Sequence, residues 1–388
     1  MSTFVPHFLV HALFSSLPLF VPIWLAEFEL TRATIGSVMG AVYIFYGGVA
    51  IPAGVLADRY GSINFVAVFL FGSAAGAIAL GLSTTFIGLV FAVLGIGFAG
   101  GLYHPPAFRL ISSQSFTSSS LFAYHNVGGN LGLGLGPFLT AILLAFATWR
   151  TAMLIAGVVL VLSGVLFVRY GPSNTTPDYE ETAGSERRIG RVRTLFSVGF
   201  TFVLLIYLLR GTFYRGAIVF IPDYLSAVAT VDSLTLFGRE VPPSQWVYSL
   251  MLLVGVGGQF LGGYVDDRFD TIWFLAIQLL LVSGILAVIG RTSGPVLFFV
   301  ILLFGFGMMM LAPALQNLVA KHTAESNRGF AYGFTTAGSW AAGGFLGASL
   351  AGLIATVGSY PQMFSVLSLI SLVTVGVVLV YAVRFHST

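Results

Sequence analysis

Residues 33–83 contain two long apolar runs that flank a short charged turn. They read ATIGSVMGAVYIFYGGVAIPAGVLADRYGSINFVAVFLFGSAAGAIALGLS. Each run has the roughly 20 apolar residues that a helix needs to cross the hydrocarbon core of a bilayer. Both runs are continuously apolar, whereas the strands of a membrane barrel alternate apolar and polar residues. This stretch therefore predicts two transmembrane helices joined by Asp58-Arg59-Tyr60-Gly61.

The composition of the whole chain agrees with a membrane protein. Of its 388 residues, 57% are hydrophobic and only 8% are charged, whereas a soluble domain carries about 25% charged residues. So few charges exclude a soluble enzyme and a disordered chain. The chain has no cysteine, which excludes a disulfide framework, a thiolate metal site and a thiol nucleophile. Its single lysine, Lys321, does not follow a phosphate-cradling glycine loop.

Apolar runs elsewhere in the chain bring the number of predicted spans to twelve. They lie near residues 5–26, 33–56, 63–83, 86–108, 120–146, 150–170, 194–225, 244–265, 271–290, 295–318, 329–356 and 360–384. The first run lacks a basic leader and a cleavage site, so we expect it to be retained as a helix. The polar segment 171–193 holds eight of the 31 charged residues and separates the spans into two groups of six. We predict an all-α membrane protein with two pseudo-symmetric six-helix bundles, residues 1–170 and 194–388, joined by this linker.

Arginine and lysine are distributed unequally between the two sides of the predicted spans. An even number of spans places both termini on one side, where eleven of these residues fall, against four on the other. Positive charge accumulates on the cytoplasmic side of membrane proteins. We therefore expect both termini in the cytoplasm and the chain in the plasma membrane. The basic cluster of the linker is interpreted as part of this pattern and not as a nucleic-acid site.

The two predicted halves repeat short motifs at a fixed spacing. Phe122-Ala123-Tyr124 returns 208 residues later as Phe330-Ala331-Tyr332. The other matches at this shift are Pro105 with Pro313, Gly97 with Gly305 and Gly136 with Gly344. At a shift of 209 residues, one more than for these matches, residues 54–60 return as residues 263–269. Repeated six-helix halves rock around a binding site near the bilayer midplane, so the repeat predicts alternating access of a small solute.

Glycine patterns inside the spans are interpreted as helix-packing surfaces. Gly128, Gly132 and Gly136 are spaced by four residues and share one helix face, where they let a neighbouring helix approach closely. Residues 95–100 match the glycine fingerprint of dinucleotide sites, but they lie within an apolar span with no preceding strand. We therefore predict no nucleotide and no other cofactor.

Several motifs resemble the major facilitator superfamily over essentially the whole chain. Residues 54–61, GVLADRYG, resemble the signature of its loop between helices 2 and 3. Residues 103–109, YHPPAFR, and residues 127–137, VGGNLGLGLGP, resemble helix 4 and helix 5 motifs of its fosmidomycin-resistance-type exporters. Arg210 with Phe220-Ile221-Pro222 is similar to the helix 7 pattern of that group. The resemblance implies a twelve-helix fold and proton-coupled export.

The sequence departs from that group at two carboxylates that are candidate proton carriers there. His11 stands where the group has an aspartate on helix 1, and Pro106 stands where it has a glutamate on helix 4. His7 and His11 are four residues apart and share a helix face. Histidine exchanges protons near neutral pH, so this pair is our candidate for proton coupling. The alternative is one interfacial histidine and one hydrogen-bonded packing histidine.

Arg210 is the strongest candidate for a substrate residue. It lies near the middle of the seventh span, where a charge is costly unless it faces a cavity or a partner. We predict that it binds an anionic solute, and the alternative is a buried ion pair. Arg215 is five residues on, about 140° around the helix. It is also a cavity candidate, but we expect it to reach the outer rim and meet Asp223.

Other polar and aromatic residues of the spans are weaker candidates for the substrate cavity. Amide side chains inside spans either contact substrate or bond neighbouring helices. The candidates are Tyr124, Asn126, Asn130, Gln259 and Trp340.

Candidate gating residues lie on the predicted cytoplasmic side. Gly54, Asp58, Arg59 and Gly61 form a turn whose carboxylate can pair with an arginine or a helix N-terminus, and thereby latch one conformation. The alternative is a solvated surface turn. In the second half the copy is Asp267 with Arg268, and a third set comprises His104 and Arg109 with His125. No carboxylate or cysteine accompanies the histidines, so we predict no metal site.

Together these features predict a secondary active transporter and not an enzyme. We expect a monomer in the lipid bilayer that exports a small organic compound, with an anion indicated by the deep arginines and protons as the coupling ion. One alternative is an importer or uniporter of an anion or metabolite with the same fold. Another is a non-transporting membrane sensor or scaffold, which the two missing carboxylates allow.

Overall fold

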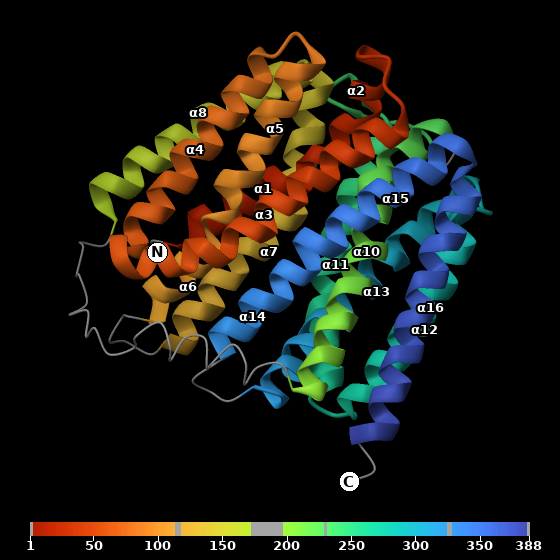
Figure 1. Ribbon diagram of the computed structural model, residues 1–388. Coiled ribbons are helices and arrows are strands. Elements are labelled where there is room, and N and C mark those ends of the chain that lie inside the picture. The colour runs from red at the N-terminus through yellow and green to blue at the C-terminus, as the bar shows by residue number, and fades with distance from the viewer. Residues whose placement is uncertain (1–2, 113–117, 172–196, 229–230, 324–327, 386–388) are drawn as a thin grey trace.

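The computed structural model describes residues 3–112, 118–171, 197–228, 231–323 and 328–385 (Figure 1). The helices of the first half are α1 (Phe4–Ser16), η1 (Leu17–Phe20), α2 (Val21–Glu27), α3 (Arg32–Tyr60), α4 (Ser62–Leu82), α5 (Phe86–Gly101), α6 (His104–Ser112), α7 (Ser118–Phe146) and α8 (Trp149–Tyr170). Those of the second half are α10 (Val198–Ala227), α11 (Pro243–Asp266), α12 (Thr271–Ile289), α13 (Gly294–Lys321), α14 (Arg328–Ala337), the π-helical turn η3 (Gly338–Gly343), α15 (Gly344–Val357) and α16 (Tyr360–Phe385).

The twelve predicted spans are confirmed. Within the described residues, twelve helical stretches are long and apolar enough to cross a membrane, and their ends lie within a few residues of the predicted ones. Many of them begin at a side chain that caps the helix, because a hydroxyl or carboxylate accepts a backbone N–H that has no partner inside the helix. The capping residues are Thr31, Thr85, Thr148, Ser197 and Asp270.

One element was not predicted. Strands β1 (Leu234–Leu236) and β2 (Arg239–Val241) form a short antiparallel hairpin between α10 and α11. Its turn consists of Phe237 and Gly238, whose φ angles of 51° and 75° are those of the tight turns that suit hairpins. The hairpin lies outside the apolar runs, and therefore hydropathy gave no sign of it.

The two halves use the same helix pairings. In the first half α1 packs against α7, α3 against α5 and α4 against α8. The equivalent helices of the second half repeat this arrangement, since α10 packs against α15, α11 against α13 and α12 against α16. This correspondence confirms the two pseudo-symmetric six-helix bundles. The halves meet where α3 lies beside α15 and α7 beside α11 (Figure 1).

Glycines allow the two halves to approach backbone to backbone. A Cβ atom at Gly36 of α3 would lie 2.5 Å from the carbonyl oxygen of Ala348, and one at Gly47 would lie 2.6 Å from the nitrogen of Ala341. Gly352 of α15 has the reciprocal contact, 2.3 Å from the carbonyl oxygen of Arg32. Small residues give membrane helices the close van der Waals packing that holds them together. The interface between the halves is therefore tight from Arg32 to Gly47.

The predicted glycine face of α7 packs against α1. A Cβ atom at Gly128, Gly132 or Gly136 would lie 2.2–2.6 Å from the backbone of α1. We expect Gly132→Ala to lower the free energy of unfolding by about 1–3 kcal/mol, because the backbone at Phe8 must move to admit a methyl group. Thermal denaturation in detergent measures this loss.

Gly95→Ala is the matched control, since a Cβ atom there meets nothing within 4 Å. Both substitutions replace a helical glycine by alanine, so both gain the same helix propensity. Only the contact with α1 differs between them. Equal midpoints for the two variants would contradict this account of the α1–α7 contact.

Candidate functional site

Arg210 and Arg215 of α10 converge on one aromatic ring. Their Cζ atoms lie 5.4 Å and 5.1 Å from the centroid of Tyr214. This differs from the prediction, in which Arg215 met Asp223 at the rim. The two Cα atoms do point apart around the helix, but arginine side chains are long enough to turn back toward a common neighbour. The Nε atoms of both arginines are buried and have no hydrogen-bond partner among the described residues.

Aromatic rings from both halves surround Arg215. Its Cζ atom lies 3.4 Å from the ring centroid of Trp340 and 5.2 Å from that of Tyr43. A guanidinium over an aromatic face is attracted by the ring quadrupole, and the attraction grows when water is excluded. We call Tyr43, Tyr214 and Trp340 the arginine cage. The predicted cavity residue Trp340 lies in η3, a π-helical turn, and such turns frequently occur at functional sites.

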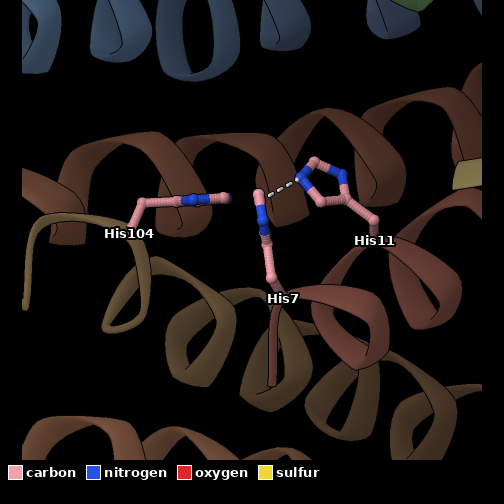
Figure 2. Close-up of side chains that lie close together, drawn as sticks. All are labelled: His7, His11 and His104. Carbon is pink, nitrogen blue, oxygen red and sulfur yellow. Dashed lines mark hydrogen bonds between the residues drawn. The ribbon is translucent and has the colours of Figure 1, made fainter. Parts of the chain in front are cut away.

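Three histidines meet in the first half beside this cage (Figure 2). The Nε2 atoms of His7 and His11 lie 3.1 Å apart, so the predicted pair does share a helix face. His7 Nδ1 donates to the carbonyl oxygen of His125 at 2.7 Å, and the rings of His7 and His125 stack with centroids 3.8 Å apart. His7 is buried within the protein, and a role of the pair in proton coupling stays a prediction. His104, predicted as a gating residue, joins the same cluster.

Tyr46 connects the histidines to the arginine cage. Its hydroxyl group hydrogen-bonds to His104 Nε2 at 2.8 Å, and its ring packs on Trp340 with centroids 4.3 Å apart. Trp340 in turn carries the guanidinium of Arg215 on its ring. A continuous set of contacts thus runs from His104 in the first half to Arg215 in the second half. Titratable and permanently charged groups are therefore placed together at the contact between the halves.

An ion-pair cluster holds the halves together near the start of α3. Arg32 Nε donates to Asp223 Oδ2 and to the Tyr360 hydroxyl, each at 2.7 Å, and that hydroxyl also donates to Asp223. The backbone N–H of Ala33 donates to Thr356 Oγ1 at 2.7 Å. We call Arg32, Asp223 and Tyr360 the Arg32 cluster. It joins α3 to α10 and α16, and the sequence indicated only that Arg32 and Asp223 lie at ends of spans.

The structure describes only part of the first predicted latch, the turn that ends α3. Gly61 ends α3 with a φ of 87°, a conformation that favours glycine, and Gly54 packs against Pro105 of α6. Arg59 is exposed, and its guanidinium lies 5.4 Å from the ring of Tyr60. The side chain of Asp58 lies outside the described residues. The function of this turn as a latch stays a prediction, as does that of Arg109 in α6.

In the second half the buried carboxylate is Asp266 and not Asp267. Asp266 accepts a hydrogen bond from Asn317 Nδ2 at 3.1 Å, whereas Asp267 is exposed. Arg268 folds back on its own helix, with its Cζ 3.6 Å from the Tyr264 ring. A shift of 208 residues, which relates the other repeated motifs, aligns Asp266 with Asp58 and Asn317 with Arg109. The role of Asp267 with Arg268 as the copy of the first turn stays a prediction.

The remaining cavity candidates lie on α7 and α11, which pack together across the halves. Tyr124 is 43% exposed and packs on Phe4, with ring centroids 4.7 Å apart. Asn126 is exposed, while Asn130 and Gln259 are half-buried. A contact of these residues with substrate stays a prediction.

Twelve membrane-crossing helices in two repeated halves, with buried charges between them, define a membrane transporter. The sequence matches the Major Facilitator Superfamily over residues 3–334 and again over residues 203–387. The chain belongs to this family, and it is a secondary transporter and not an enzyme.

Relatives and solved structures agree with this assignment. The chain is 25% identical to a probable hexose phosphate transport protein of Chlamydia muridarum, covering 84% of this chain and 79% of that one. It is also 25% identical to the 4-hydroxybenzoate transporter PcaK of Pseudomonas aeruginosa, covering 84% and 80%. The fold is similar to that of a bacterial homologue of the human lysosomal transporter Spinster in an inward-facing and occupied conformation. That comparison has a TM-score of 0.81 and 14% identity, and covers 100% of this chain and 96% of that one.

Proposed function

We propose that the protein carries a small organic anion across the plasma membrane by alternating access, and that protons are its coupling ion. The observation that carries this proposal is the pair of half-buried arginines, Arg210 and Arg215, whose Nε atoms are buried and have no hydrogen-bond partner among the described residues. A buried donor without a partner costs free energy, which a bound carboxylate or phosphate recovers. Arginine suits both groups because its planar fork forms two parallel hydrogen bonds.

The substrates named for two relatives support an anion. Hexose phosphate and 4-hydroxybenzoate differ in size and in ring chemistry, and negative charge is what they share. The arginine cage offers positive charge together with aromatic surface. We infer an organic anion with an apolar or sugar body, bound between α3, α10 and η3.

The proposed transport cycle uses the contact between the halves. We place both termini in the cytoplasm, as the distribution of arginine and lysine predicts, so that the Arg32 cluster faces the outside. On that placement the tight interface from Arg32 to Gly47 lies at the outer end, and we propose that it closes this end. Rocking to the outward-facing state requires the Arg32 cluster to break.

The histidine pair supplies a physical basis for proton coupling. The cluster that contains the pair is linked to the arginine cage through Tyr46, which hydrogen-bonds to His104 and packs on Trp340, the ring that carries Arg215. A proton on His11 adds positive charge beside the anion site and strengthens anion binding. By linkage, a bound anion favours the protonated histidine by the same factor. Proton and anion therefore bind together, which favours symport and hence uptake along an inward proton gradient.

Export is the second candidate for the direction of transport. It is supported by the resemblance of residues 103–109 and 127–137 to motifs of fosmidomycin-resistance-type exporters. In an exporter driven by the same gradient, proton and anion must bind alternately rather than together. The direction of proton-driven movement therefore separates the two candidates.

Purified protein in proteoliposomes provides the test. Radiolabelled glucose 6-phosphate and 4-hydroxybenzoate are offered with an acidic exterior, and glucose and 4-hydroxybenzyl alcohol are the matched neutral controls. We expect accumulation of an anion and of neither control, faster with the pH gradient than without it. Gradient-driven loss of preloaded anion would establish export instead. Equal movement of anions and neutral controls would contradict the proposed anion site.

A further inference from the structure

We propose that His7, His11 and His104 form a binding site for a transition-metal ion of the zinc class. One ring nitrogen from each of the three residues lies within 4.8 Å of the other two. The three side chains come from two helices, α1 and α6, and their rings point toward a common centre (Figure 2). This site goes beyond the proposed anion transport and replaces the expectation, drawn from the sequence, that the histidines bind no metal. A metal ion needs neutral imidazoles, so metal binding and proton coupling through His7 and His11 exclude each other at this cluster.

The spacing of the ring nitrogens suits tetrahedral coordination. Zinc–nitrogen bonds of about 2.0–2.1 Å place neighbouring ligands of a tetrahedron about 3.3 Å apart. The Nε2 atoms of His7 and His11 are already 3.1 Å apart. His104 then has to move its nitrogen inward by at most about 1.5 Å to reach the same ligand spacing.

Hydrogen bonds behind the cluster orient the rings as metal ligands require. His7 Nδ1 must carry a proton, because its partner at 2.7 Å is the carbonyl oxygen of His125. A neutral His7 therefore directs the lone pair of Nε2 into the cluster. Histidines that bind metals commonly donate their other ring nitrogen to a carbonyl in this way, and His104 is held by the Tyr46 hydroxyl.

The ligand set selects the class of ion. Three imidazoles suit zinc, copper, nickel and cobalt, whereas magnesium and calcium require oxygen ligands. Neutral imidazoles leave the charge of a divalent ion uncompensated. We therefore expect an anion, such as chloride or a carboxylate, to occupy the fourth position. The site thus differs from a closed structural zinc site, which uses four protein ligands.

Cobalt(II) is the probe for this site because, unlike zinc, it absorbs visible light, strongly so when tetrahedral. The full chain is purified in detergent, stripped with a chelator and titrated with CoCl₂ in chloride buffer. We expect a saturable visible absorption that corresponds to one cobalt per chain and disappears when zinc is added. His11→Asn and His104→Gln should each weaken binding more than tenfold, since even the loss of a group behind a ligand costs about 10- to 100-fold in affinity.

His322→Gln is the matched control, because His322 lies in the second half and bonds to Tyr381, away from the cluster. It should bind cobalt like the wild type. Each variant is first shown to be monodisperse and to keep its metal-free thermal midpoint, and His7→Gln replaces any variant that fails. The proposal is overturned if the wild type shows no saturable absorption, or if the cluster variants bind as it does. The titration requires no transport, so its result is independent of the direction and substrate of the carrier.

Discussion

Arg210→Ala and Arg215→Ala should each lower kcat/KM for anion transport by roughly 100-fold. Truncating one partner of a buried charge pair costs about 2–5 kcal/mol, and every 1.4 kcal/mol is a factor of ten. The loss should be large because water does not replace the missing guanidinium in a buried site. Initial rates of labelled anion uptake into proteoliposomes, measured over a range of anion concentrations, give kcat/KM directly.

Conservative substitutions separate charge from geometry in this prediction. Arg210→Lys keeps a positive charge but loses the planar fork, so its rate should fall between those of the wild type and Arg210→Ala. Arg169→Ala is the control, because Arg169 is exposed at the end of α8, a helix that packs mainly against α4. Anions should also raise the thermal midpoint of the wild type and not that of Arg210→Ala, since a ligand stabilises only the state it binds. Unchanged anion stabilisation in Arg210→Ala would show that Arg210 is structural.

The fold could be predicted from the sequence because the bilayer imposes a simple requirement on it. Every span must be long, apolar and helical, and hydropathy records all three properties. The glycine face of α7 was visible for a related reason. Close helix packing in a membrane requires small residues at a spacing of four, and Gly128, Gly132 and Gly136 meet the backbone of α1 as that spacing predicts.

The site could be predicted only residue by residue, because its geometry depends on contacts between distant segments. Arg210 was identified by the cost of its charge, and His7 with His11 by their helical spacing. Nothing local indicated that His104 would join them, or that Arg32 would pair with Asp223, 191 residues away. Arg215 was misplaced for another reason. The helical angle fixes where its Cα points, but a long side chain can reach the arginine cage from there.

The repeat offers two registers for the turn of the second half, one residue apart. The match of residues 54–60 with residues 263–269 depends on glycine and charged residues that recur out of step with the other repeats. In the second half Asp266 is buried and hydrogen-bonded to Asn317 while Asp267 is exposed, whereas the side chain of Asp58 lies outside the described residues, so the match of Asp267 with Asp58 stays a prediction. The alternation of buried and exposed positions is a property of packing, and the sequence of a continuously apolar helix does not display it.

Breaking the Arg32 cluster should open the outer end of the protein. Arg32→Ala and Asp223→Asn each remove the ion pair between the halves. Arg32→Ala leaves the hydrogen bond from Tyr360 to Asp223 within the second half in place, whereas Asp223→Asn also alters that bond. The Arg32 side chain is 36% exposed, so solvent screens part of its interaction. We expect the state that is closed at the outer end to lose about 1–2 kcal/mol of stability relative to the open state. This loss shifts the equilibrium between the closed and open states roughly 5- to 30-fold toward the open one.

A single cysteine measures this shift. The chain has no native cysteine, so Ser349→Cys introduces the only thiol. Ser349 Oγ is buried against Gly40 at the interface of the halves, where a reagent reaches it only after the halves separate. A membrane-impermeant maleimide added outside should label the Arg32→Ala and Asp223→Asn backgrounds 5- to 30-fold faster than the parent, in proportion to the open population.

The pair of Arg150 with Glu27 provides the control that makes this prediction specific. Its Nη2 and Oε1 atoms are 2.5 Å apart, and both residues belong to the first half. Arg150→Ala therefore removes an ion pair of the same chemistry without separating the halves, and should leave labelling of Ser349→Cys unchanged. The exchanged pair Arg32→Asp with Asp223→Arg should restore slow labelling, because attraction between the halves returns. Equal acceleration by Arg150→Ala would mean that labelling follows general loosening of the helices, and the Arg32 cluster would then have no role as an outer gate.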